Sequence, residues 1–211
     1  MTYPPSRTSV LADPADGVAR DGPPQFAEPL AWVSNSMPTA DRFQSIFMAA
    51  RSYALSARRL NIEAQRGIAA PESTGYMLLP SHVLAALALE LHYKALYYLE
   101  FARDFKVSGR HSHDFSKLFL ELPRQTRDEL ERRFESVMAG RNMTDVEGIE
   151  QFIGVKIGRT LVESLSHWSD VFVKVRYFFE PNESARPMLF FDELEASVLE
   201  VLRGRRPDMP L

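Results

Sequence analysis

The stretch PSHVLAALALELHYKALYYLEFARDF, residues 80–105, decides the fold of this 211-residue chain. It is followed by the polar segment KVSGR (106–110) and then by HSHDFSKLFLEL (111–122). Apolar residues recur in the first segment at steps of three and four, which is the spacing of one face of an α-helix. The sequence therefore predicts a long helix, a short turn and a second helix, with the rest of the chain packed on this hairpin. The residues that set the period are Leu84, Leu87, Leu91, Ala95 and Tyr98.

Two charged residues, Glu90 and Lys94, interrupt the long apolar helix. They are four residues apart in the Glu-then-Lys order, so they share one helix face and are able to pair. One interpretation is a partly exposed ion pair that contributes little to stability. The other is a semi-buried polar pair that needs partners from other helices.

The second helix of the hairpin begins at a His-Asp pair. Asp114 is predicted to cap the helix 115–122, because its carboxylate accepts hydrogen bonds from the free amides of the first turn. His113 is predicted to fix this corner by hydrogen bonding, and a catalytic or ligand-binding role is the alternative. Gly109 supplies the conformational freedom that a helix end or a turn needs.

Composition excludes several classes of site. The net charge is −3 and the isoelectric point is about 6.0, so no global basic field favours nucleic acid. The chain has no cysteine, which rules out a disulfide, a thiol nucleophile and a cysteine-ligated metal. The absence of cysteine is compatible with the reducing cytoplasm, where we expect the protein. No phosphate loop, nucleophile elbow or zinc motif is present, so neither a metal nor a cofactor is expected. No apolar run suits a membrane span, so no membrane association is expected either.

The chain divides into three regions by composition. Six of the 14 prolines fall within residues 1–36, which are predicted to form a disordered or loosely docked arm. Residues 37–204 are predicted to form an all-α, antiparallel bundle of about five main helices, and residues 205–211 a frayed tail. Besides the hairpin, the predicted helices are 39–65, 124–139, 149–179 and 191–203, and the third of these can break at Gly154 or Gly158.

A basic flank and an apolar seam distinguish two of these helices. The flank of helix 39–65 is predicted to be solvated, with a phosphate-binding edge as the alternative; it consists of Arg51, Arg58, Arg59 and Arg66. The seam alternates steps of four and three and requires a facing helix, from this chain or from a second subunit. Further apolar residues on the same helix favour a homodimer. The seam consists of Leu161, Leu165, Trp168, Phe172, Val175 and Phe179, and the additional residues are Val162, Val171, Val173 and Phe178.

Three segments together resemble the HEPN superfamily of helical proteins. They are ALELHYKALYYLE (88–100), GRHSHDFSKL (109–118) and HWSDVFVKVRYFFE (167–180), and the resemblance covers roughly residues 40–203. It implies an antiparallel bundle, often a homodimer, in which polar residues of three helices meet as one network. The residues that would form this network are Glu90, Lys94, His113, Asp114, Arg176, Tyr177 and Glu180.

Many HEPN proteins are metal-independent ribonucleases with an arginine followed by four to six residues and then a histidine. This sequence departs from that motif. The histidine lies eight, three and eight positions after the arginine in the pairs Arg103–His111, Arg110–His113 and Arg159–His167, so none of the three fits.

Three functional hypotheses follow. The first is a non-catalytic HEPN-like module that dimerises and binds a partner, which is a protein, a nucleotide or RNA. The second is a divergent metal-independent ribonuclease of toxin or defence type, in which Arg110 stabilises the charged phosphorane and His111 or His113 acts as the general base. The third is a helical interaction protein unrelated to HEPN. The missing motif favours the first.

Overall fold

The computed structural model describes residues 39–68, 77–108, 113–169, 171 and 189–208. In these residues it contains seven helices and no strand, which confirms the all-α class for the described part of the chain. The chain divides into residues 1–36 and 37–211, and every described residue belongs to the second unit. The helices are α1 (Thr39–Ile68), α2 (Leu78–Phe101), α3 (Phe115–Leu120), α4 (Arg124–Ala139), α5 (Thr144–Ile153), α6 (Leu161–Ser169) and α8 (Phe191–Arg205).

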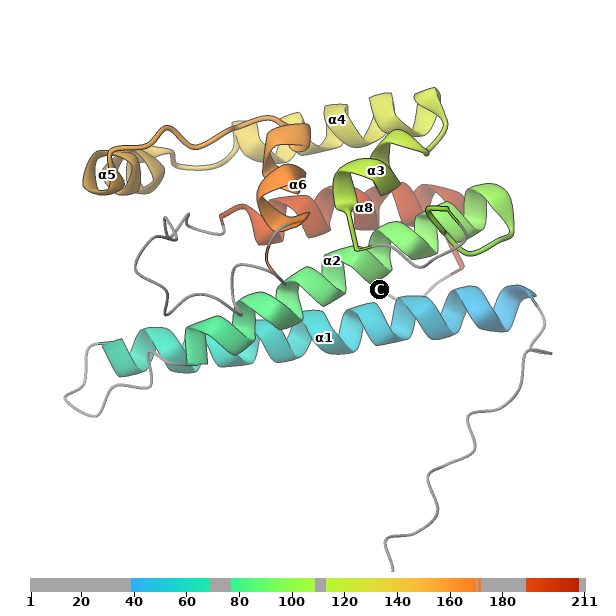
Figure 1. Cartoon of the computed structure of the whole chain (residues 1–211), viewed down its shortest axis with the longest axis horizontal. Coiled ribbons are helices and arrows are strands. Elements are labelled where there is room, and N and C mark those ends of the chain that lie inside the picture. The colour runs from blue at the N-terminus through green and yellow to red at the C-terminus, as the bar shows by residue number, and fades with distance from the viewer. Residues whose placement is uncertain (1–38, 69–76, 109–112, 170, 172–188, 209–211) are drawn as a thin grey trace, which may run out of the picture. The chain divides into compact units, whose positions relative to one another are not determined.

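The longest helices, α1 and α2, lie side by side and run in opposite directions (Figure 1). The face of α1 that packs inward is rich in alanine, which has no side chain beyond Cβ and allows two helices to approach closely. Two stacked rings, Phe43 and Phe47, extend this face with centroids 6.0 Å apart. The buried alanines of α1 are Ala50, Ala54, Ala57 and Ala64.

Helix α2 is covered on several sides, as its nearly continuous apolar sequence predicts. It packs against α1, α8 and α3, and α8 in turn packs against α4 (Figure 1). The fully buried side chains Tyr93, Leu130, Leu194 and Trp168 come from α2, α4, α8 and α6, so these helices share one core.

The helix ends agree in part with the sequence pattern. Helix α4 has the predicted bounds, and Asp114 caps α3 by accepting a hydrogen bond from the Lys117 N–H at 3.1 Å. Helix α2 ends at Phe101, before the predicted turn. The next residue, Ala102, caps it with a left-handed backbone (φ 51°) and an N–H that donates to the Tyr98 carbonyl. Gly109 lies outside the described residues.

The predicted helical region over residues 149–179 breaks at Gly154, one of the two glycines predicted for an interruption, so no continuous helix spans its described part. Helix α5 already begins at Thr144 and ends where Gly154 adopts a left-handed conformation (φ 68°), and α6 begins only at Leu161. The buried carboxylate of Glu150 explains the break, because it accepts a hydrogen bond from the Ile157 N–H at 2.9 Å. It also pairs with Lys156 at 2.8 Å, so the connection folds back onto the end of α5.

Residues at the C-terminal end are held where the sequence predicts a frayed tail. Helix α8 continues to Arg205, which pairs with Glu129 of α4 at 3.0 Å. The guanidinium of Arg206 lies over the Phe43 ring of α1 at 5.3 Å. Residues 209–211 lie outside the described part of the chain, as do the predicted arm 1–36 and the second half of the seam, Phe172, Val175 and Phe179.

Candidate functional site

The corner between α2 and α3 brings three of the predicted polar residues together. The Glu90 side chain is only 4% exposed, so the semi-buried interpretation applies. One carboxylate oxygen, Oε1, accepts a hydrogen bond from Lys94 Nζ, and the other, Oε2, lies 2.8 Å from Nδ1 of His113. Glu90 therefore joins α2 to the residue that precedes the cap of α3, while the His113 side chain stays 64% exposed to solvent.

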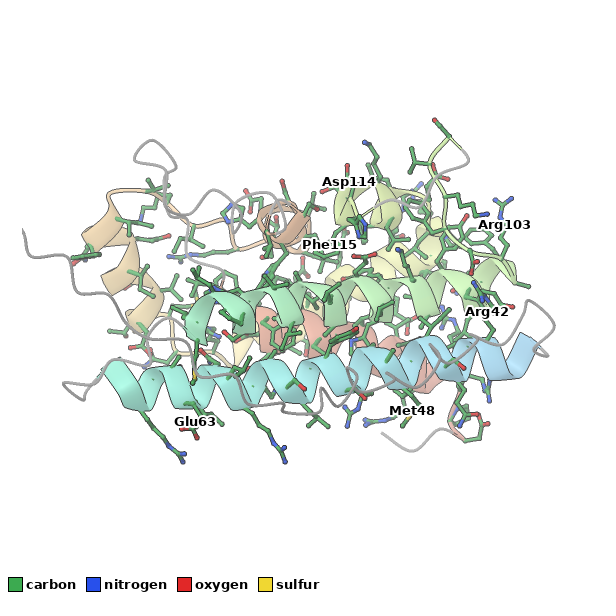
Figure 2. The ribbon with its side chains drawn as sticks, turned by 60° about the horizontal axis from the view of Figure 1, so that its bottom comes forward. Arg42, Met48, Glu63, Arg103, Asp114 and Phe115 are labelled. Carbon is green, nitrogen blue, oxygen red and sulfur yellow. The ribbon has the colours of Figure 1, made fainter. Side chains whose placement is uncertain are left out.

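Asp114 and Phe115 fix the other side of this corner, at the start of α3 (Figure 2). Although partial burial opposes it, the hydrogen bond from the Lys117 backbone lowers the pKa of Asp114. The Phe115 N–H donates to the hydroxyl of Ser169 at 3.0 Å, and the Phe115 ring is fully buried. The corner is thus attached to α2 by Glu90 and to α6 by Ser169.

The remaining predicted site residues lie outside the described residues. They are the candidate catalytic residues Arg110 and His111 and the three network residues Arg176, Tyr177 and Glu180. Of the predicted network, the structure therefore brings together Glu90, Lys94 and His113, and Asp114 follows His113 in the chain.

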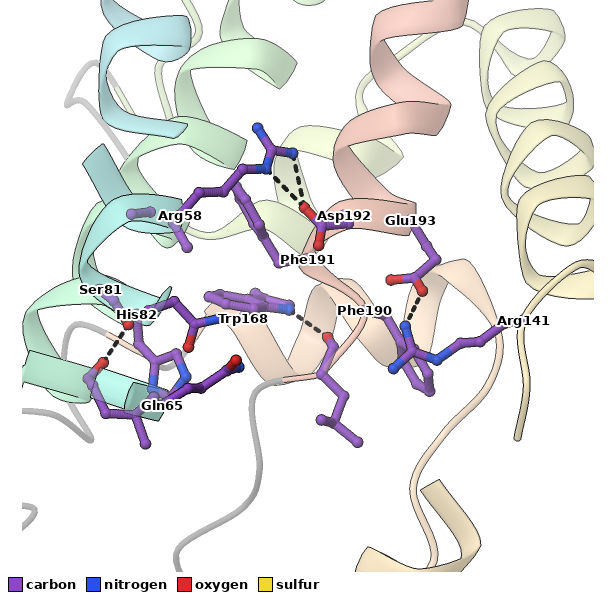
Figure 3. A pocket seen from close by; sticks show the side chains of 15 residues that line it. Arg58, Gln65, Ser81, His82, Arg141, Trp168, Phe190, Phe191, Asp192 and Glu193 are labelled. Atoms are coloured by element: carbon purple, nitrogen blue, oxygen red, sulfur yellow. Dashed lines mark hydrogen bonds and ion pairs between the residues drawn. The ribbon is translucent and has the colours of Figure 1, made fainter. Parts of the chain in front are cut away.

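A second candidate site is a pocket of about 470 Å³ between α1, α2, α6 and the start of α8 (Figure 3). Its aromatic wall consists of Trp168, Phe190 and Phe191, and His82 of α2 meets Trp168 edge-on at 6.2 Å. The Trp168 indole N–H donates to the Leu189 carbonyl at 3.0 Å, which fixes the ring. This volume and aromatic lining are typical of small-ligand sites in proteins.

The charges around the pocket are already paired. Arg58 of α1 donates to Asp192 at 2.8 Å, and Arg141 forms an ion pair with Glu193 (Figure 3). Burial lowers the pKa of His82, so its imidazole is neutral near pH 7. A phosphate would have to compete with these carboxylates for the arginines, so the pocket suits a neutral aromatic ligand better than a phosphorylated one.

A buried polar cluster lies among α1, α2 and α8, and the sequence analysis missed it. His92 of α2 is 0% exposed and faces Glu195 of α8, which is 1% exposed and also pairs with Arg58. The Arg58 side chain is still 38% exposed, but it reaches the buried Glu195, a contact that the predicted solvated flank did not include. One feature of the sequence indicates that Glu195 is buried: it occupies the apolar stripe of α8, four residues after Phe191 and three before Val198.

Burial determines the protonation of this cluster. It lowers the pKa of His92 to about 3, and the positive charges of Arg51 and Arg58 act in the same direction. It raises the pKa of Glu195 against the opposing effect of Arg58. The His92 and Glu195 side chains are closed to solvent, so we regard this pair as a structural element rather than a site for ligands.

Comparisons with known proteins add no assignment. No family model, no curated protein and no solved structure matches this chain. Among the described residues, no group of three or more His, Asp and Glu side chains is arranged to hold a metal ion. The described helices also include none that is both long enough and apolar enough to cross a membrane.

Proposed function

We propose that this chain is a non-catalytic, HEPN-like helical module that acts by forming a homodimer and by binding a partner. The observation that supports the non-catalytic part is the arrangement around Glu90. Its buried carboxylate is engaged on both oxygens, by Lys94 and by His113, and so serves to hold α2 and the start of α3 together. A buried carboxylate satisfied in this way is a normal structural feature of helical cores.

For the partner, the described surface offers two kinds of site. The pocket at Trp168 has the size and the aromatic wall for a planar small molecule, such as the base of a nucleotide. Its paired arginines give phosphate groups little support, which favours a protein partner over a nucleotide or RNA as the main one.

The homodimer is proposed from the apolar seam of residues 161–179. The Leu161, Leu165 and Trp168 side chains are at most 2% exposed and are therefore covered within one chain, whereas Val162 of the same helix is 44% exposed. Light scattering at micromolar protein should give twice the chain mass of 24.0 kDa. A mass near 24.0 kDa would contradict the dimer.

A divergent metal-independent ribonuclease is the second candidate, and one observation favours it. An exposed imidazole whose Nδ1 is held by a buried carboxylate, as in His113 and Glu90, is an arrangement that enzymes use to orient a general base.

An RNA-cleavage assay decides between the two. The full-length protein is incubated with a fluorescent single-stranded RNA in the presence of EDTA, beside the His113→Ala variant. We expect no cleavage by either protein. Cleavage by the wild type that His113→Ala abolishes, while the variant stays folded by circular dichroism, would overturn the non-catalytic proposal.

A further inference from the structure

The outer face of α1 carries a row of exposed apolar side chains at seven-residue intervals. Met48, Leu55 and Ile62 are 51%, 56% and 47% exposed. Seven residues are nearly two helical turns, so the three side chains lie along one line at a spacing of about 10 Å. Met48 projects from the side of α1 that faces away from α2 (Figure 2). The alanine face of α1 already makes the contact with α2, so this row is not needed for that packing.

Basic side chains border the row. Arg59 is exposed between Leu55 and Ile62, and it makes no ion pair within the described part of the chain. Arg66 is 71% exposed one turn beyond Ile62 and pairs with Glu63 at 2.7 Å. We call the set Met48, Leu55, Arg59, Ile62 and Arg66 the α1 outer face. Exposed apolar residues repeated every seven positions supply one of the two apolar positions per heptad by which a helix packs against another helix.

A second copy of this chain suits the α1 outer face poorly. An antiparallel pairing centred on Leu55 would place Arg51 close to Arg59 of the second copy, and a parallel pairing would place Arg59 against Arg59. Like charges beside a helix–helix seam disfavour that pairing, whereas opposite charges favour it. Arg59, which has no carboxylate partner in the described part of the chain, therefore favours a partner that brings carboxylates.

We propose that the α1 outer face binds an acidic amphipathic helix of a partner protein. The apolar residues of this helix would repeat every seven positions, and its flanking positions would be glutamate or aspartate. The row from Met48 to Ile62 is about 21 Å long, so a helix of four or more turns covers it. The inference rests on the proposed function, because both make the chain a binding module. The α1 outer face shares no residue with the α2–α3 corner, so the helix-binding proposal and the non-catalytic proposal can fail independently.

The test uses a fluorescein-labelled peptide of three heptads, with leucine at the a and d positions and glutamate at e and g. A reference peptide has lysine in place of each glutamate. Binding to the full-length protein is measured by fluorescence anisotropy. We expect the acidic peptide to bind at least about tenfold more tightly than the basic one, and its affinity to fall when salt is raised from about 50 mM to about 300 mM.

Two matched pairs of variants locate the binding. Leu55→Glu should lower the affinity for the acidic peptide about tenfold or more. Leu120→Glu, at a leucine of α3 that is 59% exposed, should leave this affinity unchanged. Arg59→Glu should lower the affinity for the acidic peptide and raise the affinity for the basic one. Arg132→Glu on α4 should change neither affinity.

Several results would overturn the proposal. They are an acidic peptide that does not bind, equal affinities for the two peptides, and equal effects of Leu55→Glu and Leu120→Glu. A dimer that Leu55→Glu dissociates would assign the face to a second copy instead. A photo-crosslinker at position 55 that captures residues 1–36 of the same chain would assign it to the chain's own N-terminal arm.

Discussion

Nδ1 of His92 lies 3.8 Å from Oε1 of Glu195, although 103 residues separate the two in the chain and both side chains are almost fully buried. Burial favours the uncharged form of each group, so the pKa of His92 falls to about 3 and the pKa of Glu195 rises above its usual 4.5. Arg58, which pairs with Glu195, supplies the positive charge of the cluster. The stability of the fold should therefore depend on pH through these two groups.

The sign of the His92 effect is set by its lowered pKa. Between pH 6.5 and about 3 the unfolded imidazole takes up a proton that the folded one does not, so its contribution to stability is present above pH 6.5 and is lost as the pH falls. Glu195 acts in the opposite sense: its contribution is present below pH 4.5 and is lost as the pH rises through its raised pKa.

The first prediction follows for His92→Leu, measured by urea unfolding between pH 7 and pH 4. The free energy of unfolding of the wild type should fall faster on acidification than that of the variant, by up to about 1 kcal/mol per pH unit. The comparison is repeated in a Glu195→Gln background; the Glu195 titration is common to both proteins and cancels in the difference, so the difference should persist without it. Parallel pH dependences in both backgrounds would contradict this account of His92.

The second prediction concerns the α2–α3 corner. His113→Ala should lower the free energy of unfolding by about 1 kcal/mol, because a hydrogen bond to a charged group is lost but the imidazole is mostly exposed. Glu90→Ala should cost more, since it removes the partner of both His113 and Lys94. In a double-mutant cycle the two changes should couple by about 0.5–1 kcal/mol. A coupling of zero would mean that the contact between Glu90 and His113 does not stabilise the fold.

The third prediction concerns the connection between α5 and α6. Glu150→Gln keeps the size of the side chain but removes the charge that Lys156 and Arg159 share. The Ile157 amide, which donates to this carboxylate, should then exchange its hydrogen faster. Hydrogen exchange measured by mass spectrometry over residues 154–160 checks this, and Glu147→Gln on the exposed side of α5 is the control. Equal exchange in the wild type and both variants would argue against a role of Glu150 in holding the connection.

The fourth prediction contrasts two glycines. A Cβ at Gly158 would lie 2.4 Å from Cβ of Glu163, so Gly158→Ala should destabilise the protein by about 1–3 kcal/mol. Gly148 lies inside α5 with no atom near the position of a Cβ, so Gly148→Ala should stabilise by about 0.5–1 kcal/mol. Thermal unfolding of the two variants measures both, and shifts of the same sign would contradict the local geometry.

Features that depend on neighbours within one or two helical turns follow from the sequence alone. The apolar period of residues 80–101 predicts α2, and its density predicts that α2 is covered on several sides. Asp114 is recognisable as a cap because its partner, the Lys117 amide, is only three residues away. The bounds of α4 follow in the same way from Pro123 and Gly140. In each case the interacting groups are close in the chain, so their residue types are enough to predict the geometry.

The tertiary structure alone decided which distant polar groups meet. The sequence pattern predicts Arg58 on a solvated flank, yet it pairs with Glu195, 137 residues away. The spacing of Glu90 and Lys94 favours a partly exposed pair, and only the packing of α2 buries Glu90 and brings His113 to it. Helical periodicity specifies which face of each helix is apolar, but not which helix covers it. The burial of these charges, and with it their pKa values and partners, is therefore set by how α1, α2 and α8 pack.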